Sequence, residues 1–484
     1  MSTPVHPESV GRSEERLHRG LQNRHVQLIA IGGAIGTGLF MGSGKTIAAA
    51  GPSVLIVYLV IGTMLFFVMR AMGELLLFNL DYKSFQDFAA DMLGPWAGFF
   101  CGWTYWLCWI VTGMADIIAV VSYFNYWVHP SDPTDIRALS LALGLVVLLG
   151  LLGLNLLTVG LFGELEFWFA IIKVVAILAL IVVGAWMIVR GFTAPDGTQA
   201  SLSNLWARPG GVFPHGADGF LAGFQIATFA FVGIELVGAT AAETADPTRT
   251  LPRAINQIPI RVLFFYVFSL VVIMSVTPWD LVSPELSPFV NLFTLVGIGA
   301  AASLMNFVVL TSAASAANSG LFSTSRMLYG LAHKNMAPRI TGVLSRRMVP
   351  AVGLVVSVIV VSSSLLLLLS DTVMEAFTVV TTIAAVLFMF VWGMILCSYI
   401  VYRGRHPQAH GGSIYKMPGG AFFVFIVYVL TRETDTLRAL LATPAWFVIL
   451  GSAWFFVRHH VKEDDTHTEH DWDGGQTAQS PAAR

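Results

Sequence analysis

Residues 31–40 read Ile-Gly-Gly-Ala-Ile-Gly-Thr-Gly-Leu-Phe and lie within the first apolar segment of the chain, with glycine at positions 32, 33, 36 and 38. A glycine in a helix interior costs about 1 kcal/mol relative to alanine, so we expect the helix to open here. Irregular backbone inside a membrane is tolerated only where it is buried in protein or lines a cavity. A half-helix N-terminus at that depth can bind a carboxylate. The alternative is close helix packing, since Gly32 and Gly36 also form a small-xxx-small face.

The composition is that of a polytopic integral membrane protein. The chain has 484 residues, of which 56% are hydrophobic and 12% are charged, whereas about a quarter of an average soluble domain is charged. Its partner is therefore the lipid bilayer, and we expect no nucleic-acid partner. The three cysteines, Cys101, Cys108 and Cys397, all lie in apolar segments, so neither a disulfide framework nor a metal site is indicated.

Apolar runs predict about twelve transmembrane helices and an all-α membrane protein. A span needs about 20 residues. Ten such runs lie near 26–49, 53–79, 97–127, 137–158, 165–189, 218–243, 260–278, 290–318, 350–370 and 374–402, and weaker ones near 419–430 and 442–457. The segment 419–430 is the doubtful one, because its apolar stretch of about 15 Å is short for a hydrocarbon core of about 30 Å.

The distribution of basic residues predicts the orientation. With a cytoplasmic N-terminus, most Lys and Arg residues fall in loops on the cytoplasmic side, which satisfies the positive-inside rule. Residues 1–25 are then a cytoplasmic tail without the short apolar run of a cleaved signal peptide, and residues 458–484 a disordered cytoplasmic tail. The predicted inside loops contain Arg249, Arg253, Arg326, Lys334, Arg339, Arg346, Arg347, Arg403, Arg405 and Lys416.

The first ten spans divide into two repeats of five, about 26–190 and 218–402, within a membrane domain over 26–457 whose extra helices occupy about 419–457. Each repeat opens with a span interrupted by glycine, and in the second repeat this is Gly233 in Phe-Ala-Phe-Val-Gly-Ile-Glu. An odd number of spans gives the repeats opposite topology. Paired broken helices in inverted repeats indicate the midplane site of a secondary transporter.

Ionisable groups inside a span are expensive and usually functional, and three such residues are candidates here. Lys173 stands in the apolar run 167–189, although its side chain could instead snorkel to the membrane surface. Glu235 has a similar predicted depth, so the two groups either form a structural pair or exchange protons. Asp116 could bind a substrate ammonium group, or it could make a polar contact between helices. Arg70 and Glu74 are spaced as an intrahelical ion pair.

Other patterns do not indicate a catalytic or cofactor site. Gly44-Lys45-Thr46 resembles the end of a phosphate-binding loop, but Leu39 stands where that motif needs its first glycine. The histidines lie in tails and loops, so no catalytic triad is indicated, and we expect neither an enzyme nor a bound cofactor. A polar face in the eighth span could line a path or join helices; it comprises Thr311, Ser312, Ser315, Asn318 and Ser319.

Several motifs carry a resemblance to a known family. They are residues 23–40, Met-Arg-Ala-Met-Gly-Glu-Leu-Leu-Leu from Met69, Gly-Trp-Thr-Tyr-Trp from Gly102, Gly-Glu-Leu-Glu-Phe-Trp-Phe-Ala from Gly163 and Phe-Val-Gly-Ile-Glu-Leu-Val-Gly from Phe231. With them the chain resembles bacterial amino acid permeases of the amino acid-polyamine-organocation superfamily. The resemblance implies a five-plus-five inverted-repeat (LeuT-like) fold with discontinuous helices 1 and 6, two extra helices, and alternating access driven by proton symport.

The resemblance also implies the site residues. Gly36, Thr37 and Gly38 would receive the substrate carboxylate. The amino group and side chain of the substrate would meet Phe229, Ala230 and Gly233. A lysine at position 173 implies coupling to protons rather than sodium, with Glu235 assisting coupling or gating.

The function implied is import of glycine, D-alanine and D-serine with protons across the bacterial inner membrane. Small residues at the site, such as Ala34 and Ala230, suit a small side chain. The alternatives are a permease of the same family for 4-aminobutyrate or L-alanine, a channel, or a membrane-embedded enzyme.

Overall fold

The computed structural model describes residues 35–80, 82, 84–128, 133–157, 159–236, 247–297, 299–369, 373–412 and 434–461. The predictions for the N-terminal tail, for the span near 419–430 and for most of the C-terminal tail concern residues outside these ranges. Within them, the assigned elements are helices, apart from a single β-bridge between Thr193 and Gln199. The chain is therefore all-α in its described part.

The N-terminal half contains α2 (Thr37–Phe40), α3 (Gly42–Ala50), α4 (Val54–Phe78), α5 (Phe85–Leu93), α6 (Pro95–Asn125), α7 (Pro133–Asn155) and α8 (Val159–Arg190). The second half contains α9 (Gly216–Ala230), α11 (Pro247–Val276), α12 (Pro288–Leu295), α13 (Gly299–His333), α14 (Ala351–Val361), α15 (Ser364–Leu367), α16 (Val373–Arg405), α17 (Pro407–Gly412) and α19 (Thr434–Val457). Short 3₁₀ turns lie at Gly51–Ser53, Leu202–Leu205, Trp279–Leu281 and Arg339–Gly342.

Helical runs long and apolar enough to span a membrane number seven in the described part of the chain. The spans predicted near 53–79, 97–127, 137–158, 165–189, 260–278 and 374–402 correspond to α4, α6, α7, α8, α11 and α16. Other predicted spans are shorter or interrupted helices. The run Gly42–Phe78 contains α3 and α4, which a sharp turn at Gly51, with φ of 60°, separates.

The predicted span 290–318 has the wrong bounds. Helix α12 ends at Leu295, Gly297 has φ of 77°, and α13 then runs from Gly299 to His333. Arg326, predicted to lie in a cytoplasmic loop, is inside α13. Hydropathy ended the span early because the second half of α13 is rich in serine, alanine and glycine, whose small side chains allow close packing against α6.

The predicted span 350–370 is also interrupted, since α14 ends at Val361 and α15 begins at Ser364. The hydroxyl groups of Ser362 and Ser363 donate to the carbonyls of Ile359 and Val360 at 2.6 and 2.7 Å. Such local side-chain bonds compete with the helical backbone, which accounts for the break.

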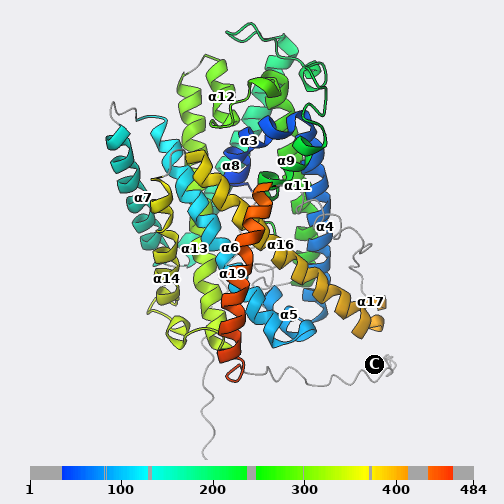
Figure 1. Ribbon diagram of the computed structural model, residues 1–484, viewed down its shortest axis with the longest axis vertical. Helices are drawn as coiled ribbons and strands as arrows, with labels where there is room; N and C mark the ends of the chain where they lie inside the picture. Colours follow the sequence, from blue (N-terminus) through cyan, green and yellow to red (C-terminus); the bar gives the residue numbers. More distant parts are fainter. Residues whose placement is uncertain are drawn as a thin grey trace, which may run out of the picture.

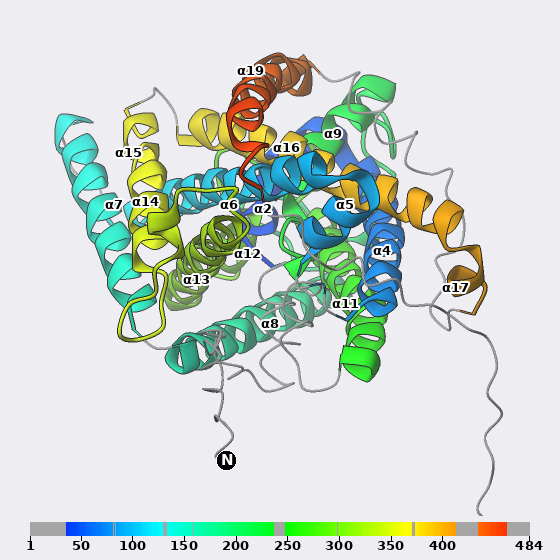
Figure 2. The ribbon, with the colours of Figure 1, turned by 90° about the horizontal axis from the view of Figure 1, so that it is seen from below.

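Helix α6 runs through the centre of the bundle, and its most extensive contacts are with α13 and α16 (Figure 1). Helices α7 and α14 lie to one side of it, and α8 crosses another face of the bundle (Figure 2). The short helix α2 lies in the middle, in contact with α9, α13 and α6. This placement surrounds α2 with the most buried part of the protein.

Candidate functional site

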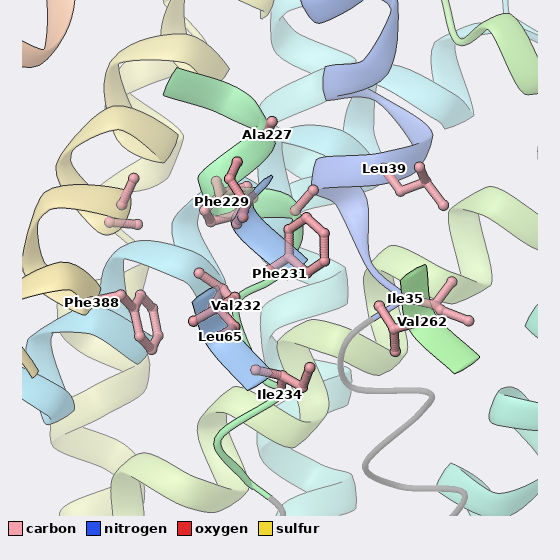
Figure 3. Packing of buried hydrophobic residues seen from close by; sticks show 14 of the residues in the cluster. Ile35, Leu39, Leu65, Ala227, Phe229, Phe231, Val232, Ile234, Val262 and Phe388 are labelled. Carbon is pink, nitrogen blue, oxygen red and sulfur yellow. The ribbon is translucent and has the colours of Figure 1, made fainter. Parts of the chain in front are cut away.

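The predicted interruption of the sixth span is confirmed, because α9 ends at Ala230 and residues 231–235 form turns. Gly233 has φ of 97°, a left-handed conformation that glycine adopts without strain. The Ala230 carbonyl, which the end of the helix leaves unpaired, accepts from the Tyr266 hydroxyl at 2.6 Å. In Figure 3, Phe229 lies on the last turn of α9, and Phe231, Val232 and Ile234 follow on non-helical chain.

The first span has its helical start within the protein. Gly36 is extended, with φ of −129° and ψ of −161°, and α2 begins at Thr37. Met41 has right-handed helical angles, so the backbone follows a helical course from Thr37 to Ala50. The part of this span before residue 35 lies outside the described ranges. The amide groups at the start of the run face the protein interior, since Ile35, Thr37 and Gly38 are buried.

Helix α2 approaches the end of α9 very closely. A Cβ atom added to Gly38 would lie 2.5 Å from the Ala230 Cα and 2.8 Å from the Ala230 nitrogen. Such distances are not possible between real atoms, so only glycine at position 38 allows the two backbones to touch. The N-terminal end of the helical run and the C-terminal end of α9 are thus brought side by side, which sets a partial positive charge near a partial negative one.

A cavity of about 20 Å³ lies at this junction, which is about the room needed for one water molecule. Six of the residues predicted to bind substrate line it: Gly36, Thr37, Gly38, Asp116, Phe229 and Ala230. Trp109, Thr112, Val232 and Ala316 complete the lining. Gly233 is not among the lining residues, and its N–H donates to the Glu235 carboxylate at 3.2 Å.

Asp116 connects α6 to α2, because the Thr37 hydroxyl donates to its Oδ1 at 2.7 Å. The polar contact between helices that the sequence left open is therefore present. The second oxygen, Oδ2, is buried and has no hydrogen-bond partner among the described residues, and the same holds for the indole N–H of Trp109. Both residues line the cavity. The cavity is thus lined by two residues that each carry a buried polar atom without a partner, and such atoms cost about 1–3 kcal/mol each.

Lys173 is buried in α8, with 1% of its surface exposed, so its amine does not reach the membrane surface by snorkelling. The carboxylates whose charges act on it are Glu166 and Asp116. Glu235 has other described contacts: it accepts from the Tyr105 hydroxyl at 3.2 Å and from the Gly233 amide. These contacts give Lys173 and Glu235 separate surroundings.

Glu166 is a buried carboxylate that the sequence analysis did not select. It accepts from the Ser315 hydroxyl at 2.7 Å and from the Asn318 amide at 2.9 Å, and Asn318 in turn accepts from Asn155 at 2.7 Å. These bonds occupy part of the polar face of α13 and join it to α7 and α8. The signal available in the sequence was the spacing of seven residues to Lys173, which is two helical turns and places both groups on one face.

Glu74, predicted to pair with Arg70 on its own helix, has partners on other helices. It accepts from the Tyr399 hydroxyl at 2.9 Å and contacts the His410 Nδ1 at 2.6 Å. Arg70 donates to Asn256 at 3.0 Å. These contacts tie α4 to α11, α16 and α17, which is a structural role.

Comparison with known proteins identifies the family of this chain. The family model described as "Amino acid permease" matches residues 25–431. The chain belongs to the amino acid permease family. The resemblance read from the motifs is thereby confirmed.

The permease has close relatives among curated proteins. It is 61% identical over 454 residues to the D-serine/D-alanine/glycine transporter of Escherichia coli (strain K12), covering 92% of this chain and 95% of that protein. It is 52% identical to the amino-acid permease AapA of Bacillus subtilis (strain 168), over 90% of this chain and 94% of the relative. The aromatic amino acid transport protein AroP of Escherichia coli O6:H1 is 38% identical, over 94% of this chain and 98% of that protein.

The described residues of the permease contain no group of three or more His, Cys, Asp or Glu side chains that could hold a metal ion. The polar groups that line the small cavity are backbone groups at the two helix ends, the Asp116 carboxylate, the hydroxyls of Thr37 and Thr112 and the Trp109 indole.

Proposed function

We propose that the permease imports small neutral amino acids, namely glycine, D-alanine and D-serine, together with protons. The observation that supports this most directly is the small cavity between α2 and the end of α9, where two helix ends and Asp116 meet. Identity of 61% to a transporter named for these three substrates supports the same choice.

The lining favours a substrate with a small side chain. Gly36, Ala230 and Ala316 bring no atoms beyond a methyl group to the cavity, and the space of about 20 Å³ must widen even for glycine. Trp109 and Phe229 close the remaining sides. A large substrate would have to displace one of these rings as well, which adds a cost that a small one avoids.

The helix ends give the two charged groups of the substrate opposite places. The carboxylate would accept from the amide groups of Gly36, Thr37 and Gly38, at the positive end of the helical run. The ammonium group would donate to the free Asp116 Oδ2 and to the carbonyl end of α9 near Phe229 and Ala230. Gly233 would act indirectly, by letting the chain turn after α9.

Lys173 and Glu235 would couple this binding to protons. Lys173 is close enough to Asp116 for their charges to interact, and Asp116 is bonded to Thr37 at the substrate site. A change in the protonation of the Lys173 amine would therefore change the electrostatic potential at Asp116 and so at the substrate site. Glu235 lies just after the break in α9, where its bond to the Gly233 amide links its charge state to the shape of the turn.

Alternating access requires the two helix ends to separate from their neighbours on one side at a time. The turn Arg339–Gly342, which Arg346 follows in the chain, and the end of α16, which contains Arg403 and Arg405, lie at the end of the bundle that carries α5 and α17 (Figure 1). By the positive-inside rule this end faces the cytoplasm. The permease would thus lie in the bacterial inner membrane with both termini inside, and it would act as a carrier rather than an enzyme.

Uptake by reconstituted permease tests the proposal. Proteoliposomes with and without an inward pH gradient would be given labelled glycine, D-alanine and D-serine. We expect uphill uptake of all three that collapses when a protonophore removes the gradient. A panel with L-alanine, 4-aminobutyrate and L-phenylalanine identifies the alternatives. Preference for L-alanine or 4-aminobutyrate would establish the runner-up within the family, and uptake of only large amino acids would refute the proposal.

A further inference from the structure

A second and much larger cavity lies away from the transport site. It has a volume of about 740 Å³, within the range of about 300–1,000 Å³ usual for small-molecule sites. The first turns of α6, the turn after α13 and the C-terminal part of α19 form its walls. Its lining residues are Phe99, Trp103, Trp106, Asn335, Met336, Ala337, Pro338, Arg339, Trp446, Ile449, Leu450, Ala453, Phe456, Val457 and His460.

The floor of this cavity is apolar in spite of its three tryptophans. The indole N–H of Trp103 donates to the Met336 carbonyl, that of Trp106 to the Ser357 hydroxyl and that of Trp446 to the Thr104 hydroxyl, at 3.0 to 3.1 Å. All three donors are thus used within the protein, and the rings present hydrocarbon faces. A ligand bound on the floor therefore gains from apolar burial and has no indole donor to satisfy.

The mouth of the cavity carries the positive charge of Arg339 and the imidazole of His460. Arg339 and His460 line it and are exposed. No side-chain hydrogen bond or ion pair engages either of them within the described part of the chain. Ile449 and Phe456 on α19 line the same cavity, with 59% and 74% of their surfaces exposed. The cavity therefore combines an apolar interior with the unpaired positive charge of Arg339 at its opening.

The position of the cavity fits a membrane leaflet. It lies at the end of the bundle that contains the turn at Arg339–Gly342 and the end of α19, which is also the end richest in arginine. Trp96, Trp103 and Trp454 lie on the same turns of α6 and α19, as tryptophans do at the boundary of the hydrocarbon core. Basic pockets between helices on the cytoplasmic side are suited to anionic headgroups.

We propose that this cavity is a binding site for an anionic phospholipid of that leaflet, with an acyl chain against Trp103, Trp106 and Leu450 and the phosphate at Arg339 and His460. The lipid would bridge α6, the turn after α13, and α19. Since α6 also carries Asp116, the occupied cavity would stabilise the helix on which the transport site is built.

The test compares two lipids that differ only in charge. Delipidated permease in detergent is titrated with dioleoyl phosphatidylglycerol or dioleoyl phosphatidylcholine, and bound lipid is counted by native mass spectrometry alongside the melting temperature. We expect saturable binding of one phosphatidylglycerol with a rise in melting temperature, and weaker binding of phosphatidylcholine. Removing the charge of Arg339 should weaken phosphatidylglycerol binding about fivefold, the equivalent of about 1 kcal/mol per arginine near an anionic surface.

Three variants assign the effect to this cavity. The double variant Arg339→Gln with His460→Gln removes the guanidinium charge and the imidazole at the mouth and should abolish the preference for phosphatidylglycerol. Ala453→Phe fills the interior and should weaken the binding of both lipids. Arg346→Gln is the matched control, because Arg346 is an exposed basic residue at the same end that does not line the cavity; it should bind as the wild type does.

Equal binding of the two lipids by the wild type would overturn the proposal, as would an unchanged preference in the double variant. A melting temperature that rises with protein concentration while lipid has no effect would assign the cavity to a second copy of the chain instead. These measurements do not use transport, so the lipid site can fail while the proposed substrates stand, or the reverse.

Discussion

Substitution of Gly38 by alanine tests how closely the two broken helices must touch. The added Cβ would lie 2.5 Å from the Ala230 Cα and 3.0 Å from the Phe229 Cδ1. Ala230 cannot move away easily, because its carbonyl accepts from Tyr266 at 2.6 Å. Overpacking of a filled interior costs about 1–3 kcal/mol, and a clash with backbone lies at the upper end of that range.

A cost of about 1–3 kcal/mol lowers the equilibrium constant for the state in which α2 and α9 touch by a factor of about 5 to 150. We therefore expect Gly38→Ala to lower the affinity for glycine by a factor in this range and to lower the melting temperature of the purified permease. The assays are equilibrium binding of labelled glycine in detergent and thermal unfolding of the same sample.

Two matched glycines separate packing from cavity filling. At Gly36 the nearest atom to an added Cβ is the Ala316 Cβ, 4.0 Å away, so Gly36→Ala should leave the melting temperature near that of the wild type. It narrows the cavity, and D-serine and D-alanine should lose more affinity than glycine. At Gly150 nothing lies within 4 Å, so Gly150→Ala should leave binding unchanged. Wild-type affinity and melting temperature in Gly38→Ala would refute the contact on which the site depends.

Three further predictions concern the buried charges. Asp116→Asn retains an acceptor for Thr37 but loses the charge, so glycine binding should fall at least tenfold while the melting temperature changes little; retained affinity would show that the ammonium group binds elsewhere. Lys173→Ala and Glu235→Gln should abolish accumulation driven by a pH gradient while exchange of labelled for unlabelled glycine persists, and unchanged uphill uptake in both would exclude them from coupling. Glu166→Gln keeps the bond from Ser315 and should remain folded, yet the pH at which uptake is half-maximal should shift; an unmoved pH profile would leave Glu166 a purely structural residue.

Local features of the sequence determined the class of protein and the interruption of its sixth predicted span. Hydropathy identified the spans α4, α6, α7, α8, α11 and α16 because each carries enough apolar side chains to cross the hydrocarbon core by itself. Glycine marked the interruption after Ala230 for an equally local reason, since its conformational freedom is a property of one residue.

Tertiary structure alone decided which of these pieces meet. The bond from Thr37 to Asp116 joins positions 79 residues apart, and that from Ser315 to Glu166 joins positions 149 apart. A helix that is apolar on most sides gives no indication of which face turns toward which neighbour. For that reason neither the unpaired Oδ2 of Asp116 nor the large cavity lined by Trp103 could be predicted from the sequence; both depend on how the helices pack.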